Sequence, residues 1–311
     1  MPYRQALIQK HSINGSALHV PMLAIAGDSA TGKTTLSNGL AKALGPEQIT
    51  WMCTDDYHRY DRIERKDLPF TALHPECNYL EIMEQHLQLL TLGQPILKPI
   101  YNHDGGTLDR PVLVHPAKYV IVDGLFPLWS KLSRACFDVT VFLDPPEHIR
   151  RQWKVYRDVT KRHYTEDQVL KDLDKREPES EAYIRPQRKN ADIVIRFAPV
   201  EGASDSKALS ATILLRPTIP HPDLSDVLSN NPNGALHMKL IRDDDGKPVD
   251  AIHVHGHATR EASREIEAAI WSKLGIDTPV PECLGEIEEG KRSEPLAIAQ
   301  LILLYHLLLA S

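Results

Sequence analysis

The sequence predicts an α/β fold, in which a mainly parallel sheet is flanked by helices and an α+β extension follows. Three observations lead to this prediction. Short apolar runs alternate with amphipathic segments over residues 1–200, as is typical of layered proteins with a parallel sheet. A glycine-rich loop separates the first apolar run from the first amphipathic segment. Beyond Pro199 the chain becomes small and polar, so we expect a second unit over residues 201–311.

Each element of the first unit has its own signal. Strand-like apolar runs occur at residues 22–26, 48–53, 119–124, 138–144 and 191–197. Helical patterns occur at residues 33–44, 78–93, 145–162 and 165–176. We expect Asn78 to cap the second helix and Gly93 to end it. We expect Thr165 to form a capping box with Gln168 at the start of the fourth.

The second unit is predicted from three segments. A short strand is expected at residues 211–217. Residues 237–257 predict two strands joined at Asp245-Gly246, because that dipeptide tolerates the positive backbone angles of a tight turn. The apolar segment 295–310 is too short for a comfortable membrane span. We expect it to form a buried closing helix, packed with the rest of the extension on the first unit.

Composition argues against several classes of partner. The formal net charge is −6 with 25% charged residues and no block of consecutive Lys or Arg. The sequence therefore lacks the electrostatic signature of nucleic-acid or anionic-membrane binding. The four cysteines, at positions 53, 77, 136 and 283, are far apart, without a C-x-x-C pair or a secretory signal. They indicate reduced thiols in a cytoplasmic protein.

The stretch GDSATGKT, residues 27–34, matches the pattern G-x-x-x-x-G-K-[ST] between a strand and a helix. In such a loop backbone N–H groups face the phosphates, Lys33 reaches the β- and γ-phosphates, and the Thr34 hydroxyl ligates Mg²⁺. The motif predicts a P-loop kinase that binds ATP and Mg²⁺. The expected nucleotide-binding residues are Gly27, Asp28, Ser29, Ala30, Thr31, Gly32, Lys33, Thr34 and Thr35. Asp123, at a strand end, is expected to bind the metal through water or to align the reacting groups.

The acceptor of the phosphoryl group is expected beside the stretch CTDDYHRYDR, residues 53–62. This stretch follows the strand 48–53, and ligands of open α/β sheets lie beyond the carboxyl ends of strands. Transfer to a hydroxyl needs a group that takes its proton, for which Asp55 and Asp56 are both candidates. The expected hydroxyl and phosphate contacts are Tyr57, His58, Arg59 and Arg62.

A third cluster lies on the predicted helix 145–162. Its members share one helix face and are Lys154, Arg157, Asp158, Lys161 and Arg162. We expect this face to close over the triphosphate. The alternative is an exposed helix side carrying salt bridges.

Several segments together resemble the phosphoribulokinase and uridine kinase family, in family order and over nearly the whole chain. They are TDDYHRYDR, PIYNH, YVIVDGLFP, YRDVTKR and EAYIRPQRKNADIVIRF. The forms DDYHRYDR and YNH are similar to the cyanobacterial and plant branch, whose acceptor is a sugar phosphate. The resemblance implies ATP-dependent phosphorylation of ribulose 5-phosphate at O1, in a reductive pentose phosphate cycle, by a homodimer. The alternatives are a kinase of uridine or another pentose derivative and a non-catalytic nucleotide-binding regulator.

The resemblance also implies roles for single residues. Asp55 would be the base that deprotonates O1. The residues that would hold the sugar phosphate are His58, Arg59 and Arg62, with Tyr101 and His103 of YNH as further contacts. The residues that would act on the nucleotide and metal are Lys154 on phosphate, Arg157 and Arg162 on the transferring group, and Asp158 on the metal.

The chain departs from the family pattern at three positions. Many relatives carry glutamate where this chain has Asp123. The shorter side chain of aspartate favours metal binding through a water molecule. His163 stands where relatives usually have glycine, which costs backbone freedom in the segment expected to close. Ala30 stands where redox-regulated plant relatives have cysteine. Since alanine forms no disulfide, we expect no thiol switch between this position and Cys53.

Overall fold

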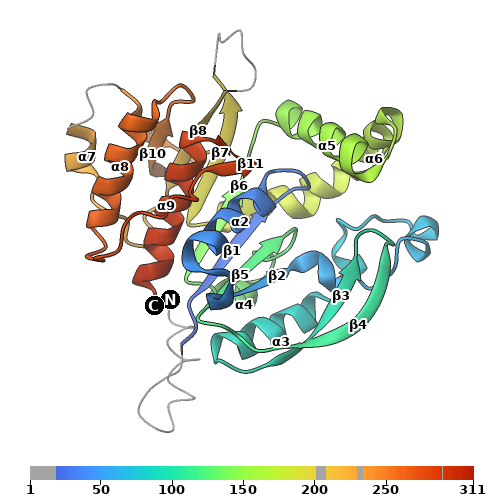
Figure 1. The fold of residues 1–311 in the computed structure, drawn as a ribbon. Helices are drawn as coiled ribbons and strands as arrows, with labels where there is room; N and C mark the ends of the chain where they lie inside the picture. Colours follow the sequence, from blue (N-terminus) through green and yellow to red (C-terminus); the bar gives the residue numbers. More distant parts are fainter. Residues whose placement is uncertain (1–18, 201–207, 230–233, 289) are drawn as a thin grey trace.

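The computed structural model describes residues 19–200, 208–229, 234–288 and 290–311, which build one eight-stranded sheet covered by helices on both faces (Figure 1). The strand order is β2-β5-β1-β6-β7-β8-β10-β9. The parallel strands are β1 (Met22–Gly27), β2 (Ile49–Cys53), β5 (Tyr119–Gly124), β6 (Val139–Leu143) and β7 (Ile193–Pro199). The antiparallel strands are β8 (Leu209–Leu215), β9 (Leu236–Arg242) and β10 (Pro248–Val254). The predicted α/β class with a mainly parallel sheet is confirmed.

Two hydrophobic cores lie on opposite faces of the sheet because side chains alternate along each strand. In β1, Leu23 and Ile25 enter one core, whereas Met22 and Ala24 enter the other. The first core is covered by α2 (Lys33–Leu44), α8 (Arg260–Ser272) and α9 (Glu294–Leu309). The second is covered mainly by α3 (Leu80–Thr91). The apolar segment near the C-terminus is therefore a buried helix, α9, as expected.

Strands β8, β9 and β10 continue the main sheet, whereas the short strands β11 (Glu286–Glu288) and β12 (Lys291–Arg292) form a separate two-stranded sheet. The predicted hairpin joins β9 to β10, with Gly246 at φ 78° in its turn. Asp243, beside this turn, is buried and accepts hydrogen bonds from Arg216 and Arg188. The boundary predicted at residue 200 adjoins residues 201–207, which lie outside the described residues, and the two-part division stays a prediction.

Two local expectations need comment. Asn78 does not cap α3, whose N-cap is Tyr79. The prediction was wrong because the Asn78 side chain makes hydrogen bonds to other loop residues. A two-stranded hairpin, β3 (Ile96–Asn102) and β4 (Thr107–Val114), was not predicted. It stands apart from the main sheet beside β2 (Figure 1), and β4 is exposed on both sides.

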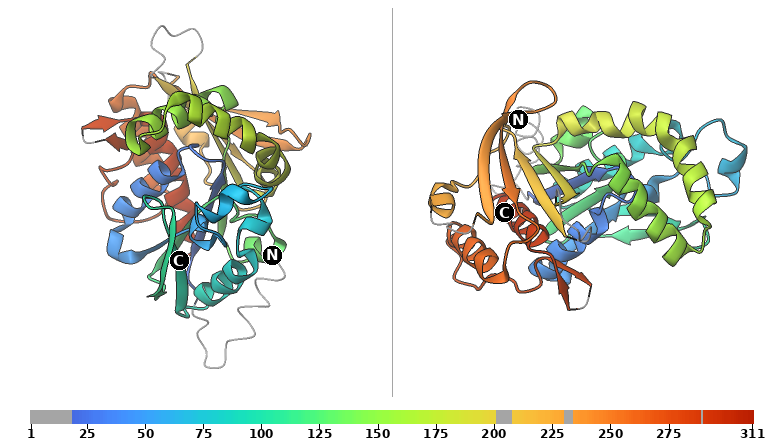
Figure 2. Two further views of the ribbon diagram at one scale, coloured as in Figure 1. Left: turned by 90° about the vertical axis from the view of Figure 1, so that its right-hand side faces the viewer. Right: turned by 90° about the horizontal axis from the view of Figure 1, so that it is seen from above.

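Helices α5 (Glu147–Arg162) and α6 (Glu166–Glu179) form a pair at the opposite side of the molecule from α8 (Figure 2). His163 joins them in a left-handed conformation, with φ 58°. The predicted capping box of Thr165 and Gln168 starts α6, which a π-helical turn, Ser180–Ile184, follows. We define α5, α6 and this turn as the lid.

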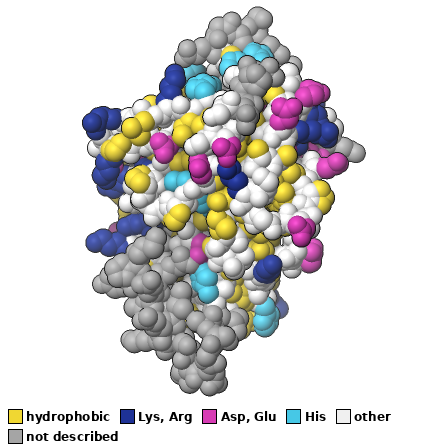
Figure 3. Space-filling model, turned by 90° about the vertical axis from the view of Figure 1, so that its left-hand side faces the viewer, with side chains coloured by type: hydrophobic (Ala, Val, Ile, Leu, Met, Phe, Trp, Pro, Cys, Tyr) yellow, Lys and Arg dark blue, Asp and Glu magenta, His cyan; other side chains and the backbone are white. Residues whose placement is uncertain are grey.

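The remaining short elements are α4 (Lys131–Ala135), α7 (Ser225–Ser229), β11 (Glu286–Glu288) and β12 (Lys291–Arg292). On the face that carries α7 and α8, acidic and basic side chains are interspersed with hydrophobic ones (Figure 3). Within the described ranges, every helix is too short or too polar to cross a bilayer.

Candidate active site

The glycine-rich loop joins β1 to α2 and closes around its own lysine. Gly32 has φ 97° at the N-cap of α2, and Ala30 has φ 67°, a left-handed angle that is costly for a residue with a Cβ. The Lys33 ammonium donates hydrogen bonds to the carbonyl oxygens of Gly27 (2.9 Å) and Asp28 (2.7 Å). Burial lowers the pKa of Lys33, opposed by nearby carboxylates. The ammonium therefore lies within the loop that is expected to cradle phosphate.

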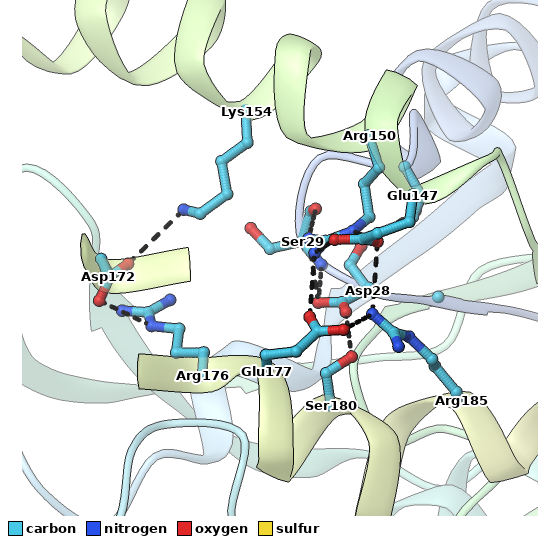
Figure 4. A network of polar contacts seen from close by, with 12 residues as sticks. Asp28, Ser29, Glu147, Arg150, Lys154, Asp172, Arg176, Glu177, Ser180 and Arg185 are labelled. Atoms are coloured by element: carbon cyan, nitrogen blue, oxygen red, sulfur yellow. Dashed lines mark hydrogen bonds and ion pairs between the residues drawn. The ribbon is translucent and has the colours of Figure 1, made fainter. Parts of the chain in front are cut away.

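The loop is tied to the lid through Asp28 and Ser29 (Figure 4). The Asp28 carboxylate accepts hydrogen bonds from the Ser29 backbone N–H (2.6 Å) and from the Ser180 hydroxyl. Arg150 of α5 lies 3.6 Å from the same carboxylate and donates to the Ser29 carbonyl (3.0 Å). Arg157 donates to the Ser29 hydroxyl (3.3 Å). Sequence patterns did not reveal Arg150 or Ser180, because neither belongs to a motif and the contacts form only when the lid packs on the loop.

The charged face predicted on α5 converges on one carboxylate. Asp158 is buried and pairs with the Lys154 ammonium at 2.8 Å and with Arg157 Nε at 2.8 Å. Arg162 lies 3.7 Å away and is half-exposed. Burial would raise the pKa of Asp158, but hydrogen bonds from Arg157 and Lys154 hold it below its ordinary value. Lys161 is exposed, so four of the five predicted residues meet.

The two adjacent carboxylates after β2 have different surroundings. Asp56 forms an ion pair with Lys98 of β3 and accepts a hydrogen bond from the Tyr101 backbone N–H (3.0 Å). Both of its oxygens are thereby used to hold the β3–β4 hairpin. The geometry favours Asp55 over Asp56 as the acid-base group.

Asp55 lies in the 3₁₀ turn Thr54–Tyr57 at the carboxyl end of β2. Burial would raise the pKa of its carboxyl group, but surrounding positive charge holds that pKa below its ordinary value. The groups that lower it are, in order, His58, His103, Lys33 and Arg65. Asp55 is therefore an ionised carboxylate at neutral pH, which a base requires.

His58 is buried and has a defined hydrogen-bonding role. The Asn78 amide donates to the carbonyl oxygens of Ala72 (3.1 Å) and His74 (2.9 Å), so its oxygen is left to accept from His58 Nδ1 at 2.7 Å. Burial lowers the pKa of His58 to about 4. A neutral ring that donates through Nδ1 has an acceptor at Nε2, which suits a substrate hydroxyl.

The remaining predicted substrate residues lie around the hairpin. Tyr101 packs edge-on against His58, with ring centroids 4.8 Å apart, and against His103 at 5.1 Å. Arg62 donates to the His103 carbonyl at 2.5 Å. Arg59 is engaged elsewhere, because it donates to the Asn78 carbonyl and lies 3.4 Å from a carboxylate oxygen of α3. Three of these four side chains thus gather beside Asp55 and the hairpin turn.

Arg65 belongs to this group although sequence reasoning missed it. It donates to the Tyr101 hydroxyl, lies over the ring of Tyr101 at 4.9 Å, and lowers the pKa of Asp55. Its Nη1 is buried without a hydrogen-bond partner within the described part of the chain. Such a donor is costly unless a ligand satisfies it. The sequence spacing of Arg65 to Arg62 was the only signal available.

Two of the three residues expected to bind Mg²⁺, Thr34 and Asp123, have oxygen ligands suited to that ion. Thr34 lies in the first turn of α2 with an exposed side chain, and Asp123 pairs with Cys53 in the register of β5 and β2. Asp123 is 3% exposed, accepts from Ser37 Oγ at 3.2 Å, and has its pKa raised by burial to about 6. Carboxylate and hydroxyl oxygens are the ligands Mg²⁺ prefers, so these two residues fit the ion. The carboxylate of Asp158 is surrounded by cations, and its metal role stays a prediction.

Comparisons with known proteins agree with this geometry. The sequence model of the phosphoribulokinase / uridine kinase family matches residues 22–204. A phosphoribulokinase from Synechocystis sp. is 40% identical over 189 residues, which is 61% of this chain and 57% of that protein. The chloroplastic phosphoribulokinase of Mesembryanthemum crystallinum is 31% identical over 213 residues, 62% of this chain and 54% of that one. The chain thus spans little more than half the length of these two relatives.

Two other comparisons bear on the fold and the acceptor. A uridine kinase from Shewanella piezotolerans is 31% identical over 182 residues, 56% of this chain and 86% of that one. The solved structure of phosphoribulokinase from Rhodobacter spheroides superposes with a TM-score of 0.58 at 18% identity, covering 82% of this chain and 97% of that one. The second likeness concerns the fold alone.

The parallel sheet, the glycine-rich loop and the two-helix lid define a P-loop kinase fold. Within that class, the chain belongs to the phosphoribulokinase / uridine kinase family. The family model ends at residue 204, so the sequence resemblance expected beyond that point stays a prediction.

Proposed function

We propose that the protein transfers the γ-phosphoryl group of ATP to O1 of D-ribulose 5-phosphate, giving ribulose 1,5-bisphosphate. The observation that carries the proposal is the position of Asp55. It is an ionised carboxylate at the end of β2, close enough to Lys33 of the loop for each to shift the pKa of the other. A base that lies between a phosphate-binding lysine and a group of polar side chains suits transfer to a hydroxyl.

In the proposed reaction, Asp55 takes the proton of the O1 hydroxyl as that oxygen attacks the γ-phosphorus, and the bond from the γ-phosphorus to the bridging oxygen breaks so that ADP leaves. His58 accepts a hydrogen bond from another sugar hydroxyl through Nε2, and Arg62 and Arg65 hold the sugar phosphate. Arg157 and Arg162 stabilise negative charge on the transferring group. Mg²⁺, held by Thr34 and Asp123, would supply charge neutralisation on the nucleotide phosphates.

The similarity to phosphoribulokinases favours this acceptor, as do Lys33 and Arg65, whose positive charges act on Asp55. A sugar phosphate carries charge that uridine lacks, and Arg65 Nη1 is a buried donor without a hydrogen-bond partner among the described residues. We further propose a homodimer, a role in a reductive pentose phosphate cycle, and a cytoplasmic location. The location rests on the four free cysteines, each without a disulfide partner among the described residues.

Phosphorylation of uridine is the second candidate. The similarity to the Shewanella piezotolerans uridine kinase favours it. The match covers 86% of that protein, compared with 57% and 54% of the two phosphoribulokinases. The two acceptors make different demands, since uridine needs a site for its base and ribulose 5-phosphate needs one for its phosphate.

The test is the release of ADP from ATP and Mg²⁺ with ribulose 5-phosphate, with uridine, or without an acceptor. We expect kcat/KM for ribulose 5-phosphate to exceed that for uridine by at least about 10²-fold, as in sites built on hydrogen bonds. Phosphorus NMR of the product should show a second phosphate ester. Faster turnover of uridine would assign the second candidate, and ADP release equal in all three would contradict both.

A further inference from the structure

Three chemically different side chains meet where β2 ends beside the hairpin turn. They are Cys53 at the last position of β2, Asp55 in the 3₁₀ turn after it, and His103 in the turn directly after β3. The thiol sulfur, a carboxylate oxygen and a ring nitrogen all lie within 4.8 Å of one another. A sulfur, an oxygen and an imidazole nitrogen form the donor set of zinc-like ions, and Mg²⁺ does not prefer it.

The three donors can close around one ion. A tetrahedral zinc ion has bonds of about 2.0–2.3 Å, which hold its ligand atoms roughly 3.5 Å apart. The required movement falls on His103, whose side chain is exposed in the turn between β3 and β4. Nearby cations do not take these atoms: Lys33 donates to loop carbonyls and Arg65 to the Tyr101 hydroxyl.

The charge around the sulfur favours a cation. Burial raises the pKa of the Cys53 thiol well above its ordinary value, and Asp55 and Asp123 raise it further. The same carboxylates attract a divalent ion. The charge of that ion would stabilise the thiolate form of Cys53, which burial and the carboxylates otherwise disfavour. Binding releases the thiol proton to solvent and leaves the fourth position of the ion to water.

We infer that Cys53, Asp55 and His103 form a binding site for a zinc-class transition metal ion. The ion takes the carboxylate of Asp55, so a loaded protein has no base at that position. The site is therefore inhibitory if Asp55 acts as proposed, but metal binding itself does not depend on the proposed function.

The test uses the full chain without nucleotide, because ATP binds the same ions. Titration with Co²⁺ should give one equivalent of bound metal and a thiolate-to-cobalt charge-transfer band in the near ultraviolet, which Zn²⁺ then abolishes. In Cys53→Ser the band should be lost, and Zn²⁺ affinity should fall by more than the roughly 10- to 100-fold that loss of an outer-shell partner costs. His103→Ala should weaken Zn²⁺ binding but keep the band.

Cys283→Ser is the matched control, since Cys283 is also partly exposed but lies in the extension. It should keep both the band and the affinity. A wild-type protein without a thiolate band would overturn the inference, as would a band that survives in Cys53→Ser. If Cys53→Ser fails to fold, as judged by circular dichroism, unchanged Zn²⁺ affinity in folded His103→Ala overturns it instead.

Discussion

Lys98 of β3 and Asp56 of the turn after β2 form an ion pair that joins the hairpin to the main sheet. Their side chains are 10% and 13% exposed, so the pair is largely shielded from water. Because Asp56 also accepts from the Tyr101 backbone, it holds the strand that carries Tyr101 against the turn of Asp55. Asp56 therefore has a structural role, and the adjacent Asp55 is left free to act as the proposed base.

Breaking this pair should destabilise the protein. Lys98→Met leaves a largely buried carboxylate without its counter-charge, and loss of one partner of a buried pair typically costs about 3–5 kcal/mol. We expect the lower end of that range because both groups keep some exposure. Urea unfolding measures it, with Lys291→Met as control, since its pair with Glu288 is exposed and should contribute little. Equal effects of the two substitutions would contradict the assignment.

Stability should fall between pH 6.5 and pH 4, in part through His306. This buried residue of α9 has its pKa lowered to about 4, by burial first and then by His221. In the unfolded chain His306 is protonated below about pH 6.5, whereas in the folded chain it stays neutral down to about pH 4. The contribution of neutral His306 to the free energy of unfolding is therefore fully present above pH 6.5 and is lost as the pH falls towards 4.

The measurement is the free energy of urea unfolding at several pH values. His306 should contribute a slope of up to about 1.4 kcal/mol per pH unit in that window. His306→Gln should have a shallower slope than the wild type, and His148→Gln, which changes an exposed histidine, is the control. Parallel slopes in wild type and His306→Gln would show that His306 titrates normally.

Arg65 should matter for the acceptor and not for ATP. Its Nη1 is buried without a partner within the described residues, and its Nη2 donates to Tyr101 beside Asp55. Arg65→Met should raise KM for ribulose 5-phosphate by about 10- to 10²-fold, since loss of a hydrogen bond to a charged group costs about 1.5–3 kcal/mol. KM for ATP should stay within about twofold of the wild-type value, which corresponds to a change in binding free energy below about 0.5 kcal/mol.

Arg151→Met is the control for this prediction, because Arg151 pairs with Asp174 on the outside of the lid. Arg62→Ala should resemble Arg65→Met in kind, since Arg62 contacts the His103 carbonyl. An effect of Arg65→Met confined to ATP would place Arg65 on the nucleotide side.

A reversible thiol switch should be absent. Ala30 stands where the family resemblance implies a disulfide partner for Cys53, and alanine forms no disulfide. The raised pKa of Cys53 also keeps its sulfur in the less reactive thiol form. Turnover should be equal after oxidised and after reduced dithiothreitol, assayed with a chelator present to remove transition metals. A large reversible loss that disappears in Cys53→Ser would refute this prediction.

Local sequence patterns determine only part of the fold and of the site. The P-loop, the sheet and α5 were predictable because each depends on short patterns: Gly32-Lys33, buried alternation, and the i, i+4 spacing of Lys154 and Asp158. The choice between Asp55 and Asp56 was not, because Lys98 lies 42 residues from Asp56. Non-local pairing of this kind leaves no periodic signal.

The same reasoning explains the wrong cap and the missed residues. Asn78 has a side chain that favours helix N-caps, but its amide is used by His58 and by two loop carbonyls. Arg150 and Ser180 acquire their role only when the lid meets Asp28. Tertiary contacts, and not local propensity, therefore determine the N-cap of α3 and the roles of Arg150 and Ser180.

The most direct test of the account is the turnover of Asp55→Asn with ribulose 5-phosphate. Asparagine keeps the size of the side chain but cannot take the O1 proton, so kcat should fall by about 10²- to 10⁴-fold. KM for ATP should barely change, because Asp55 is not among the residues expected to hold the nucleotide, and circular dichroism should confirm the fold. A kcat for Asp55→Asn close to that of the wild type would contradict the account and move the base to another residue.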